Sequence, residues 1–112
     1  MGRAPLHESV VITDVVDQLP VTAQATTSRA LLDTEAVRVV AFTFDTGEQL
    51  TEHTAAEPVL VQVIDGRLRF TVDGVSYELR AGDCVYLAPH APHALEALEP
   101  TRLALVFVHG AG

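Results

Sequence analysis

The sequence predicts an all-β domain in which short antiparallel strands form a sandwich or a barrel. About eight apolar runs of strand length follow one another, with turn residues every few positions. No segment after residue 20 combines the length and the period of a helix. The pair Asp73–Gly74 joins two alternating runs, and both residues readily adopt the positive φ that a tight hairpin requires. The length of 112 residues fits one domain.

The first 26 residues are weakly patterned, and we expect them to form an N-terminal arm or an edge segment. Within this arm, SVVITDVVDQL fits either a short strand or one to two helical turns, and Pro20 ends the element in either case. A single barrel domain is then expected over residues 27–112.

Two strands are expected next, in TSRALLD and EAVRVVAFTFD, around a turn at Asp33–Thr34. The second run is rich in valine and phenylalanine, which pack well on pleated surfaces. The following TGEQLTEHTAAE is predicted to be a polar connection. A nearly continuous apolar run, PVLVQVIDG, then has the length of a buried strand.

The clearest alternation lies in RLRFTVDGVSYELR, where apolar residues occupy every second position on each side of the central turn. Such alternation is typical of strands with one buried face. The segment PHAPH is expected to form a rigid loop. Three more strands are expected in CVYLA, HALEALE and RLALVFVHG.

The charge of the chain argues against nucleic acid and membranes as partners. The net charge is −8, and the seven basic residues, all arginine, form no cluster. Phosphate backbones and anionic lipids repel such a chain. No apolar run reaches the roughly 18 residues that cross a bilayer, and the N-terminus lacks the apolar core of a signal peptide. Since the single cysteine also suits a reducing compartment, we expect a cytoplasmic protein.

Two histidine motifs lie at a characteristic separation within residues 47–97. Gly47, His53 and Gly66 fit a first motif that runs G, five residues, H-x-H, three or four residues, E, six residues, G. Gly82 and His93 fit a second motif that runs G, five residues, P-x-G, two residues, H, three residues, N. With these motifs the chain resembles the small single-domain, RmlC-like cupins. The resemblance implies a double-stranded β-helix, which is a jelly-roll barrel.

The chain departs from these motifs where the family holds its metal. The resemblance implies four protein ligands, of which only His53 and His93 remain. Ala55 stands at the second histidine position and Val59 at the glutamate position, and neither carries a donor atom. In the second motif, other residues replace the proline, the glycine and the asparagine, namely Ala88, His90 and Ala97.

Two histidines alone are expected to bind a divalent ion weakly, because catalytic sites commonly use at least three protein donors. Glu57 and His90 are the candidates for a further donor. We expect instead that Glu57 is a solvated loop carboxylate and that His90 serves the loop conformation, since it stands at a glycine position. A divalent transition metal (iron, manganese, nickel or zinc) is therefore expected not to be tightly bound.

The barrel interior is the expected ligand site. Its lining should be apolar, with His53 and His93 as a hydrogen-bonded pair. Cys84, on the same face as Tyr86, is expected to be a small buried hydrophobe. Gln62 should point away from the interior, and His7 and His109 are taken as incidental. The predicted lining comprises His53, Val59, Val61, Tyr86, His93 and Leu95, with Val63, Leu68 and Phe107 as further candidates.

Three functions stay open at this point. The favoured one is a metal-free or metal-poor cupin that binds a small organic molecule. The second is a metal-dependent oxygenase, isomerase or lyase that uses His53, His93 and a further donor. The third is a structural or regulatory dimer whose barrel holds only its own side chains. A homodimer is expected in any case, through EAVRVVAFTF and the N-terminal SVVITDVV, because open sheet edges favour pairing.

Overall fold

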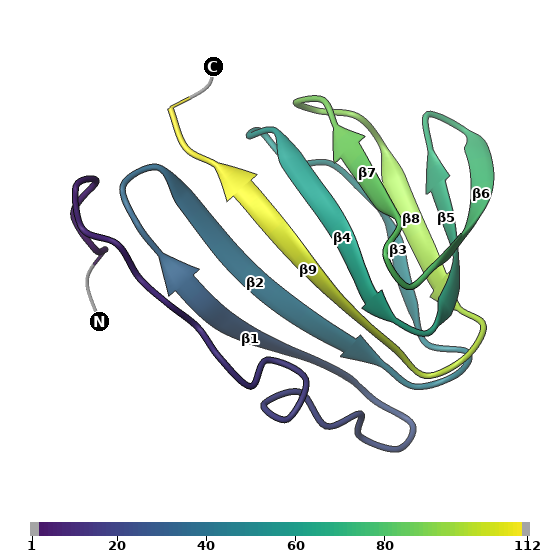
Figure 1. Cartoon of the computed structure of the whole chain (residues 1–112). Coiled ribbons are helices and arrows are strands. Elements are labelled where there is room, and N and C mark those ends of the chain that lie inside the picture. The colour runs from purple at the N-terminus through teal and green to yellow at the C-terminus, as the bar shows by residue number, and fades with distance from the viewer. Residues whose placement is uncertain (1–2, 111–112) are drawn as a thin grey trace.

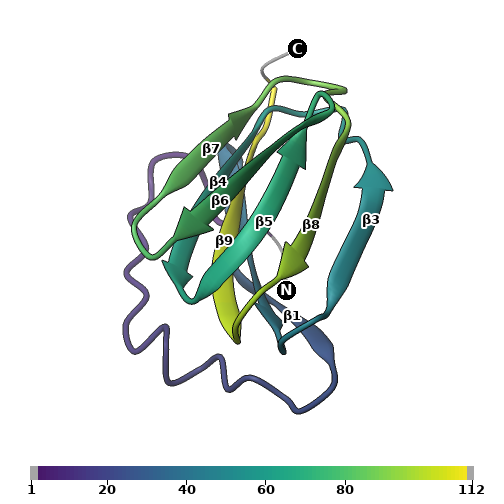
Figure 2. The same cartoon turned by 90° about the vertical axis from the view of Figure 1, so that its right-hand side faces the viewer.

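Two antiparallel sheets face each other across one apolar core (Figures 1 and 2). The computed structural model describes residues 3–110, and this part of the chain contains nine strands and no helix. The first sheet has the order β1 (Thr26–Asp33), β2 (Val37–Phe44), β9 (Thr101–Val108), β4 (Val59–Asp65) and β7 (Cys84–Leu87). The second has the order β3 (Gln49–His53), β8 (His93–Ala97), β5 (Arg67–Val72) and β6 (Val75–Arg80). The predicted all-β class is confirmed.

From β2 onward the chain passes repeatedly from one sheet to the other, which is the connectivity of a jelly roll. Only β1–β2 and β5–β6 are hairpins of consecutive strands. The centre of the first sheet instead joins distant segments, because β9 pairs with β2 on one side and with β4 on the other. The predicted jelly-roll barrel is thus confirmed as well.

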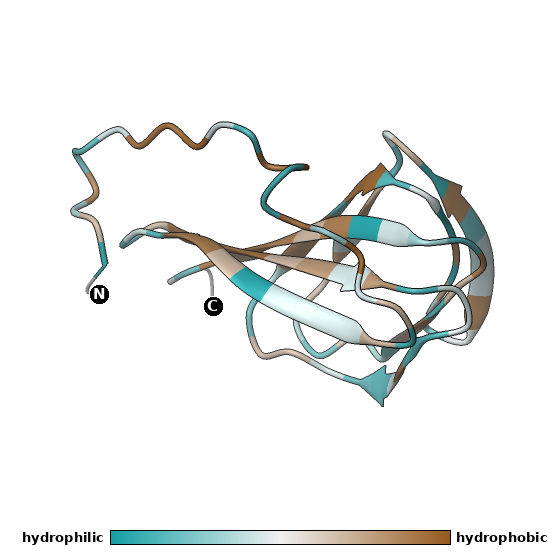
Figure 3. Cartoon of the chain, turned by 90° about the horizontal axis from the view of Figure 1, so that it is seen from below, coloured by the Kyte–Doolittle hydropathy of each residue, from teal (hydrophilic) through white to brown (hydrophobic). Residues whose placement is uncertain are grey.

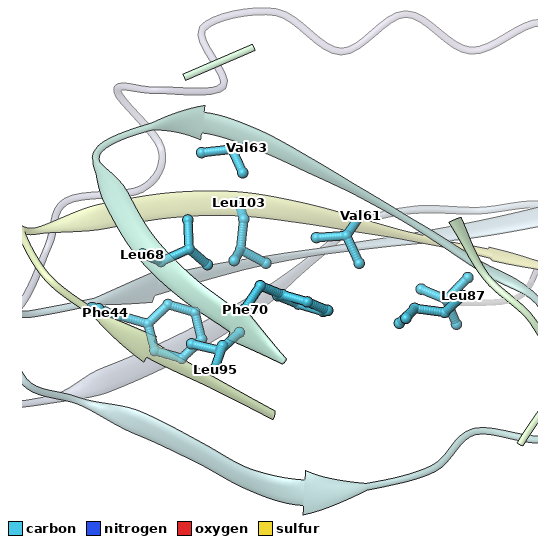
Figure 4. Packing of buried hydrophobic residues seen from close by; sticks show 10 residues of the cluster. Phe44, Val61, Val63, Leu68, Phe70, Leu87, Leu95 and Leu103 are labelled. Carbon is cyan, nitrogen blue, oxygen red and sulfur yellow. The ribbon is translucent and has the colours of Figure 1, made fainter. Parts of the chain in front are cut away.

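The core forms because the strands alternate between buried and exposed residues. On β4, Val59, Val61 and Val63 are buried, while Gln62 between them is exposed, as predicted. The inward side chains of both sheets meet in a cluster that Figure 4 shows from close by. This cluster comprises Phe44, Val59, Val61, Val63, Leu68, Phe70, Leu87, Leu95, Ala97 and Leu103.

The predicted hairpin turn is present between β5 and β6. Asp73 and Gly74 have φ values of 50° and 80°, so both take the left-handed conformation of a two-residue hairpin loop. The strands on either side pair in register from Val72–Val75 to Arg67–Arg80. The local Asp-Gly signal therefore predicted this part of the fold completely.

The predicted polar connection over residues 46–57 is wrong in its middle part, because Gln49–His53 forms β3. This strand is polar and mostly exposed, so its composition carries no strand signal. Its pairing with β8 makes it a strand, since Gln49 lies opposite Glu96 and Leu50 opposite Leu95. The tertiary partner, and not local propensity, decides the conformation here.

The N-terminal arm forms neither the strand nor the helical turns that were considered for SVVITDVVDQL. It contains turns at residues 6–7, 15–18 and 23–24, and in the second of these the Gln18 amide donates to the Asp14 carbonyl at 3.1 Å. Figure 3 shows the arm as an irregular trace that includes apolar stretches. β1 begins at Thr26, close to the predicted boundary at residue 27. The division into arm and barrel stays a prediction, and residues 1, 2, 111 and 112 lie outside the described part.

Arg102 attaches this arm to the first sheet. Its Nε donates to the carbonyl of Leu19 at 2.5 Å, and its Nη1 donates to Asp65 Oδ2 at 2.8 Å. Leu19 itself is only 3% exposed. One guanidinium therefore links the arm, β9 and β4.

No helix of residues 3–110 has the length and hydropathy needed to cross a membrane.

Gly66 allows the chain to turn from β4 in one sheet to β5 in the other. Its φ is +95°, and a Cβ atom there would collide with the Pro100 carbonyl and with Thr101. Gly47 has a similar φ of +86°, but a Cβ atom would meet nothing within 4 Å. Both glycines therefore need a positive φ, but only at Gly66 does the surrounding structure leave no space for a Cβ atom.

Replacing Gly66 by alanine is expected to destabilise the protein by roughly 2–5 kcal/mol, because the conformational cost and the collision add. Gly47→Ala, the matched control, carries only the conformational cost of roughly 1–2 kcal/mol. Urea unfolding followed by circular dichroism measures both. Equal losses for the two variants would show that the Pro100 contact is relieved without cost.

Candidate functional site

His53 and His93 lie side by side at one end of the barrel. His53 is the last residue of β3 and His93 the first of β8, and the two are directly paired across the strands. A bulge between Leu50 and His53 shifts the register by one residue and brings His53 opposite His93. Their Nε2 atoms are 3.1 Å apart. His93 is buried, with 8% of its surface exposed, whereas His53 is exposed.

The other ring nitrogen of each histidine is held by the backbone. His53 Nδ1 lies 2.8 Å from the Thr51 carbonyl oxygen, and His93 Nδ1 lies 2.9 Å from that of Ala91. A carbonyl oxygen can only accept, so each Nδ1 carries a hydrogen and donates it. The rings are thereby fixed in orientation, with both Nε2 atoms directed at each other.

Phe70 of β5 supports the His93 ring from the side. The two rings are nearly parallel, at an interplanar angle of 3° with centroids 6.3 Å apart. The rings of His53 and His93 meet at 62° with centroids 4.2 Å apart. Stacking and the backbone hydrogen bond together leave the His93 ring little freedom.

A cavity of about 270 Å³ opens beside this histidine pair. Its only polar side chains are those of His53, His93 and Thr54. Five of the six residues predicted to line the site do line this cavity: His53, Val59, Val61, His93 and Leu95. Phe107 does so too, whereas Val63 and Leu68 belong to the core cluster but not to the lining. The lining also contains residues that were not predicted, namely Phe42, Leu50, Thr54, Ala55, Phe70, Leu87, Leu103 and Leu105.

Tyr86 is the wrong member of the predicted set. It pairs with Leu60 on the outer face of β7 and is 64% exposed. Cys84, two residues earlier on the same face, is exposed as well, so its expected burial is also wrong. The inward residues of this strand are Val85 and Leu87, because they pair with the buried Val61 and Val59, and Leu87 lines the cavity. Since β7 is only four residues long, the sequence pattern does not show which face is buried.

Glu57 and His90, the candidate further donors, do not line the cavity. Glu57 Oε2 accepts a hydrogen bond from His109 Nδ1 at 2.7 Å. His90 is exposed, has a φ of 65°, and donates its backbone amide to the Ala55 carbonyl at 2.7 Å. The positive φ agrees with the expected conformational role of His90 at the glycine position of the motif.

The residues present do not fit a resident catalytic metal ion. Ala55 and Val59 form part of the cavity wall and have no donor atom. Within residues 3–110, no three histidine, cysteine, aspartate or glutamate side chains are grouped so that they could hold a metal. The histidine pair alone is below the usual minimum of three protein ligands.

His109, which was expected to be incidental, makes structural contacts with two carboxylates. Its side chain is 11% exposed, and it lies between Glu57 and Asp33, with Nε2 3.6 Å from Asp33 Oδ1. It contributes to a second cavity of about 600 Å³, between β1 and the N-terminal arm. No local pattern marks this contact, because the three residues come from three distant segments.

A match to a known family of proteins accompanies this geometry. The model of the Cupin domain matches residues 40–109, which is more than half of the sequence. The chain belongs to the cupin family. No protein with a curated description matches it.

Solved structures agree with the cupin fold. A protein of unknown function from Streptococcus pyogenes superposes with a TM-score of 0.83 at 22% identity, over 100% of this cupin and 98% of that chain. A cupin superfamily protein from Desulfitobacterium hafniense reaches 0.80 at 18% identity, over 90% and 93%. Salicylate 1,2-dioxygenase from Pseudoaminobacter salicylatoxidans reaches 0.72 at 16% identity, over 84% of this cupin but 28% of that chain. At these identities the likeness establishes the fold alone.

Removing the Glu57 carboxylate is expected to destabilise this cupin, because the largely buried His109 side chain then loses the acceptor of its Nδ1 hydrogen. The loss expected for Glu57→Ala is roughly 1–3 kcal/mol, the cost of an unsatisfied buried donor. Glu52→Ala is the matched control, since Glu52 is an exposed residue of β3. Urea unfolding of both variants gives the difference. A Glu57→Ala variant as stable as the control would show that water replaces the carboxylate.

Proposed function

We propose that this cupin binds a small organic molecule in its barrel cavity without a resident metal ion. The observation that carries the proposal is the cavity itself, whose apolar wall is interrupted only by two imidazoles and one threonine hydroxyl. An apolar pocket with a few convergent polar groups is the usual character of a small-molecule site. The missing metal donors at Ala55 and Val59 support binding over metal-dependent catalysis.

The size of the cavity sets the size of the ligand. Apolar cavities of about 150 Å³ hold benzene. A cavity of about 270 Å³ therefore suits one ring, or an aliphatic body of similar size, with its substituents. An open cavity also supports a ligand-binding protein over a barrel filled by its own side chains. The homodimer stays a prediction, for which β1 offers an edge of the five-stranded sheet.

Ala55 and Ala56 allow a matched test of ligand binding. Ala55 lines the cavity, whereas its neighbour Ala56 is exposed. Saturation-transfer NMR with a panel of one-ring compounds, neutral and anionic, detects binding to the unmodified protein. We expect Ala55→Phe to abolish binding, because the larger side chain fills the cavity, and Ala56→Phe to leave it unchanged. Binding that survives in Ala55→Phe, with the fold verified by circular dichroism, would place the ligand elsewhere and overturn the proposal.

Elemental analysis tests the absence of a resident metal. Protein purified without added metal is expected to contain far less than one transition-metal ion per chain, because two imidazoles hold such an ion weakly. Near-stoichiometric metal that disappears in a His53→Ala, His93→Ala double variant would favour the metal-dependent alternative. The control is His7→Ala, which removes an exposed histidine from the arm.

A further inference from the structure

We propose that β6 is the contact surface for a second copy of this chain, and that the two β6 strands pair antiparallel about a two-fold axis at Tyr77. The pairing joins the four-stranded sheets of the two copies into one continuous sheet. The inference goes beyond the proposed function, because it concerns a surface outside the cavity. It follows from a comparison of the sheet edges and from the residue order of β6.

Three of the four edge strands carry features that hinder pairing with another chain. The edge of β1, which the sequence favoured for a homodimer, is interrupted by a bulge between Ala30 and Leu32. Ala4 of the arm also donates its amide to the Asp33 carbonyl of β1 at 2.8 Å. β7 has only four residues, and β3 is mostly polar and contains a bulge. β6, at the right-hand side of Figure 1, has none of these features and pairs with β5 in an unbroken register.

β6 presents apolar side chains at its free edge. Tyr77 lies opposite Phe70 and Leu79 opposite Leu68, and the two partners on β5 are buried. Opposed residues of paired strands point to the same face, so these side chains of β6 point to the side of the core. Tyr77 is nevertheless 50% exposed and Val75 52% exposed. The apolar face of the core therefore continues along β6 and ends in solvent.

The backbone of β6 directs hydrogen-bonding groups at the same edge. The Arg80 amide donates to Asp83 Oδ2 at 2.8 Å, and the Arg80 carbonyl accepts from the Asp83 amide at 2.9 Å, so both groups point away from β5. This direction alternates along an antiparallel strand, so the backbone groups of Ser76 and Glu78 also point away from β5. Within residues 3–110 no strand pairs with β6 on this side.

The residue order of β6 fits a second copy in one register. In VSYEL, the apolar residues lie symmetrically about Tyr77. An antiparallel copy centred on Tyr77 places Val75 opposite Leu79 of the other copy. Ser76 then lies opposite Glu78, and the outward backbone groups of both form a hydrogen-bonded pair. A register centred on Glu78 would instead place two carboxylates opposite each other, which is destabilising.

The charges at the two ends of β6 complement each other in this register. Arg80, whose side chain is 73% exposed, lies opposite Gly74 of the other copy and next to Asp73. The two-fold axis repeats this contact at the other end. Glu78 adds no free charge, because its carboxylate is bonded to Arg67 at 2.6 Å.

The small size of this interface predicts a weak dimer. A single strand of six residues buries less than the roughly 800 Å² per partner of a standard interface. Self-association is therefore measured over a wide range of concentration, from about 10 µM to 1 mM, by analytical ultracentrifugation of the full chain.

Tyr77→Lys is expected to weaken the dimer by roughly tenfold or more, because two lysines then meet at the two-fold axis. The matched control is Tyr86→Lys, since Tyr86 is also an exposed tyrosine but lies on the outer face of β7. This control should dimerise like the unmodified chain.

Cysteine substitutions test the register itself. Cys84 is the single cysteine of the chain and is exposed, so the substitutions are made in a Cys84→Ser background. Opposed residues at a non-hydrogen-bonded position have Cα atoms about 4.5 Å apart, a separation that a disulfide spans. Under mild oxidation, Tyr77→Cys is expected to form a disulfide-linked dimer. Val75→Cys should not, because its two copies lie about 13 Å apart along the strands.

The outcomes separate this inference from the proposed function. A chain that stays monomeric over the whole range would overturn the inference and leave the cavity as a binding site. A dimer that Tyr77→Lys does not weaken would place the interface at another edge, such as β1, and would overturn it too. Cross-linking of Val75→Cys as fast as that of Tyr77→Cys would reject the axis at Tyr77. If Tyr77→Lys does not fold by circular dichroism, the cysteine variants decide alone.

Discussion

The pairing of β9 with both β2 and β4 is the interaction on which the structure depends. β9 comes from the C-terminal end of the chain, yet it lies at the centre of the five-stranded sheet. Its inward residues Leu103, Leu105 and Phe107 also line the cavity. The first sheet therefore cannot be complete before the last strand is in place. Such non-local pairing is typical of β-proteins, and it means that fold and cavity form together.

The site depends on a smaller constraint, the register of β3 against β8. A bulge after Leu50 brings His53 opposite His93, and a shift of one residue would turn the His53 side chain to the other face. The backbone carbonyls of Thr51 and Ala91 then set both rings so that their Nε2 atoms meet. The site is thus built by main-chain geometry around two side chains, with Phe70 as a lateral support.

Compared with the metal-binding members of its family, this cupin keeps the barrel but has fewer side chains that could bind a metal ion. The positions of two expected donors are occupied by Ala55 and Val59, which enlarge and line an apolar wall. Where four ligands would hold an ion, two imidazoles remain, with their Nε2 atoms 3.1 Å apart. In the proposed function, the two imidazoles supply polar contacts to the ligand, and the wall supplies shape and hydrophobic contact. The arrangement changes what the barrel binds without changing how it folds.

The sequence by itself determined the features that depend on neighbouring residues. The turn at Asp73–Gly74, the alternation of β4, β5 and β6 and the all-β class all follow from local conformational preferences and strand periodicity. Tertiary structure alone decided which face of the short β7 is buried, and therefore that Leu87 lines the cavity and Tyr86 does not. It likewise made a strand of polar β3 and joined Glu57 to His109. These outcomes depend on the partner strand and its register, which no local stretch of sequence contains.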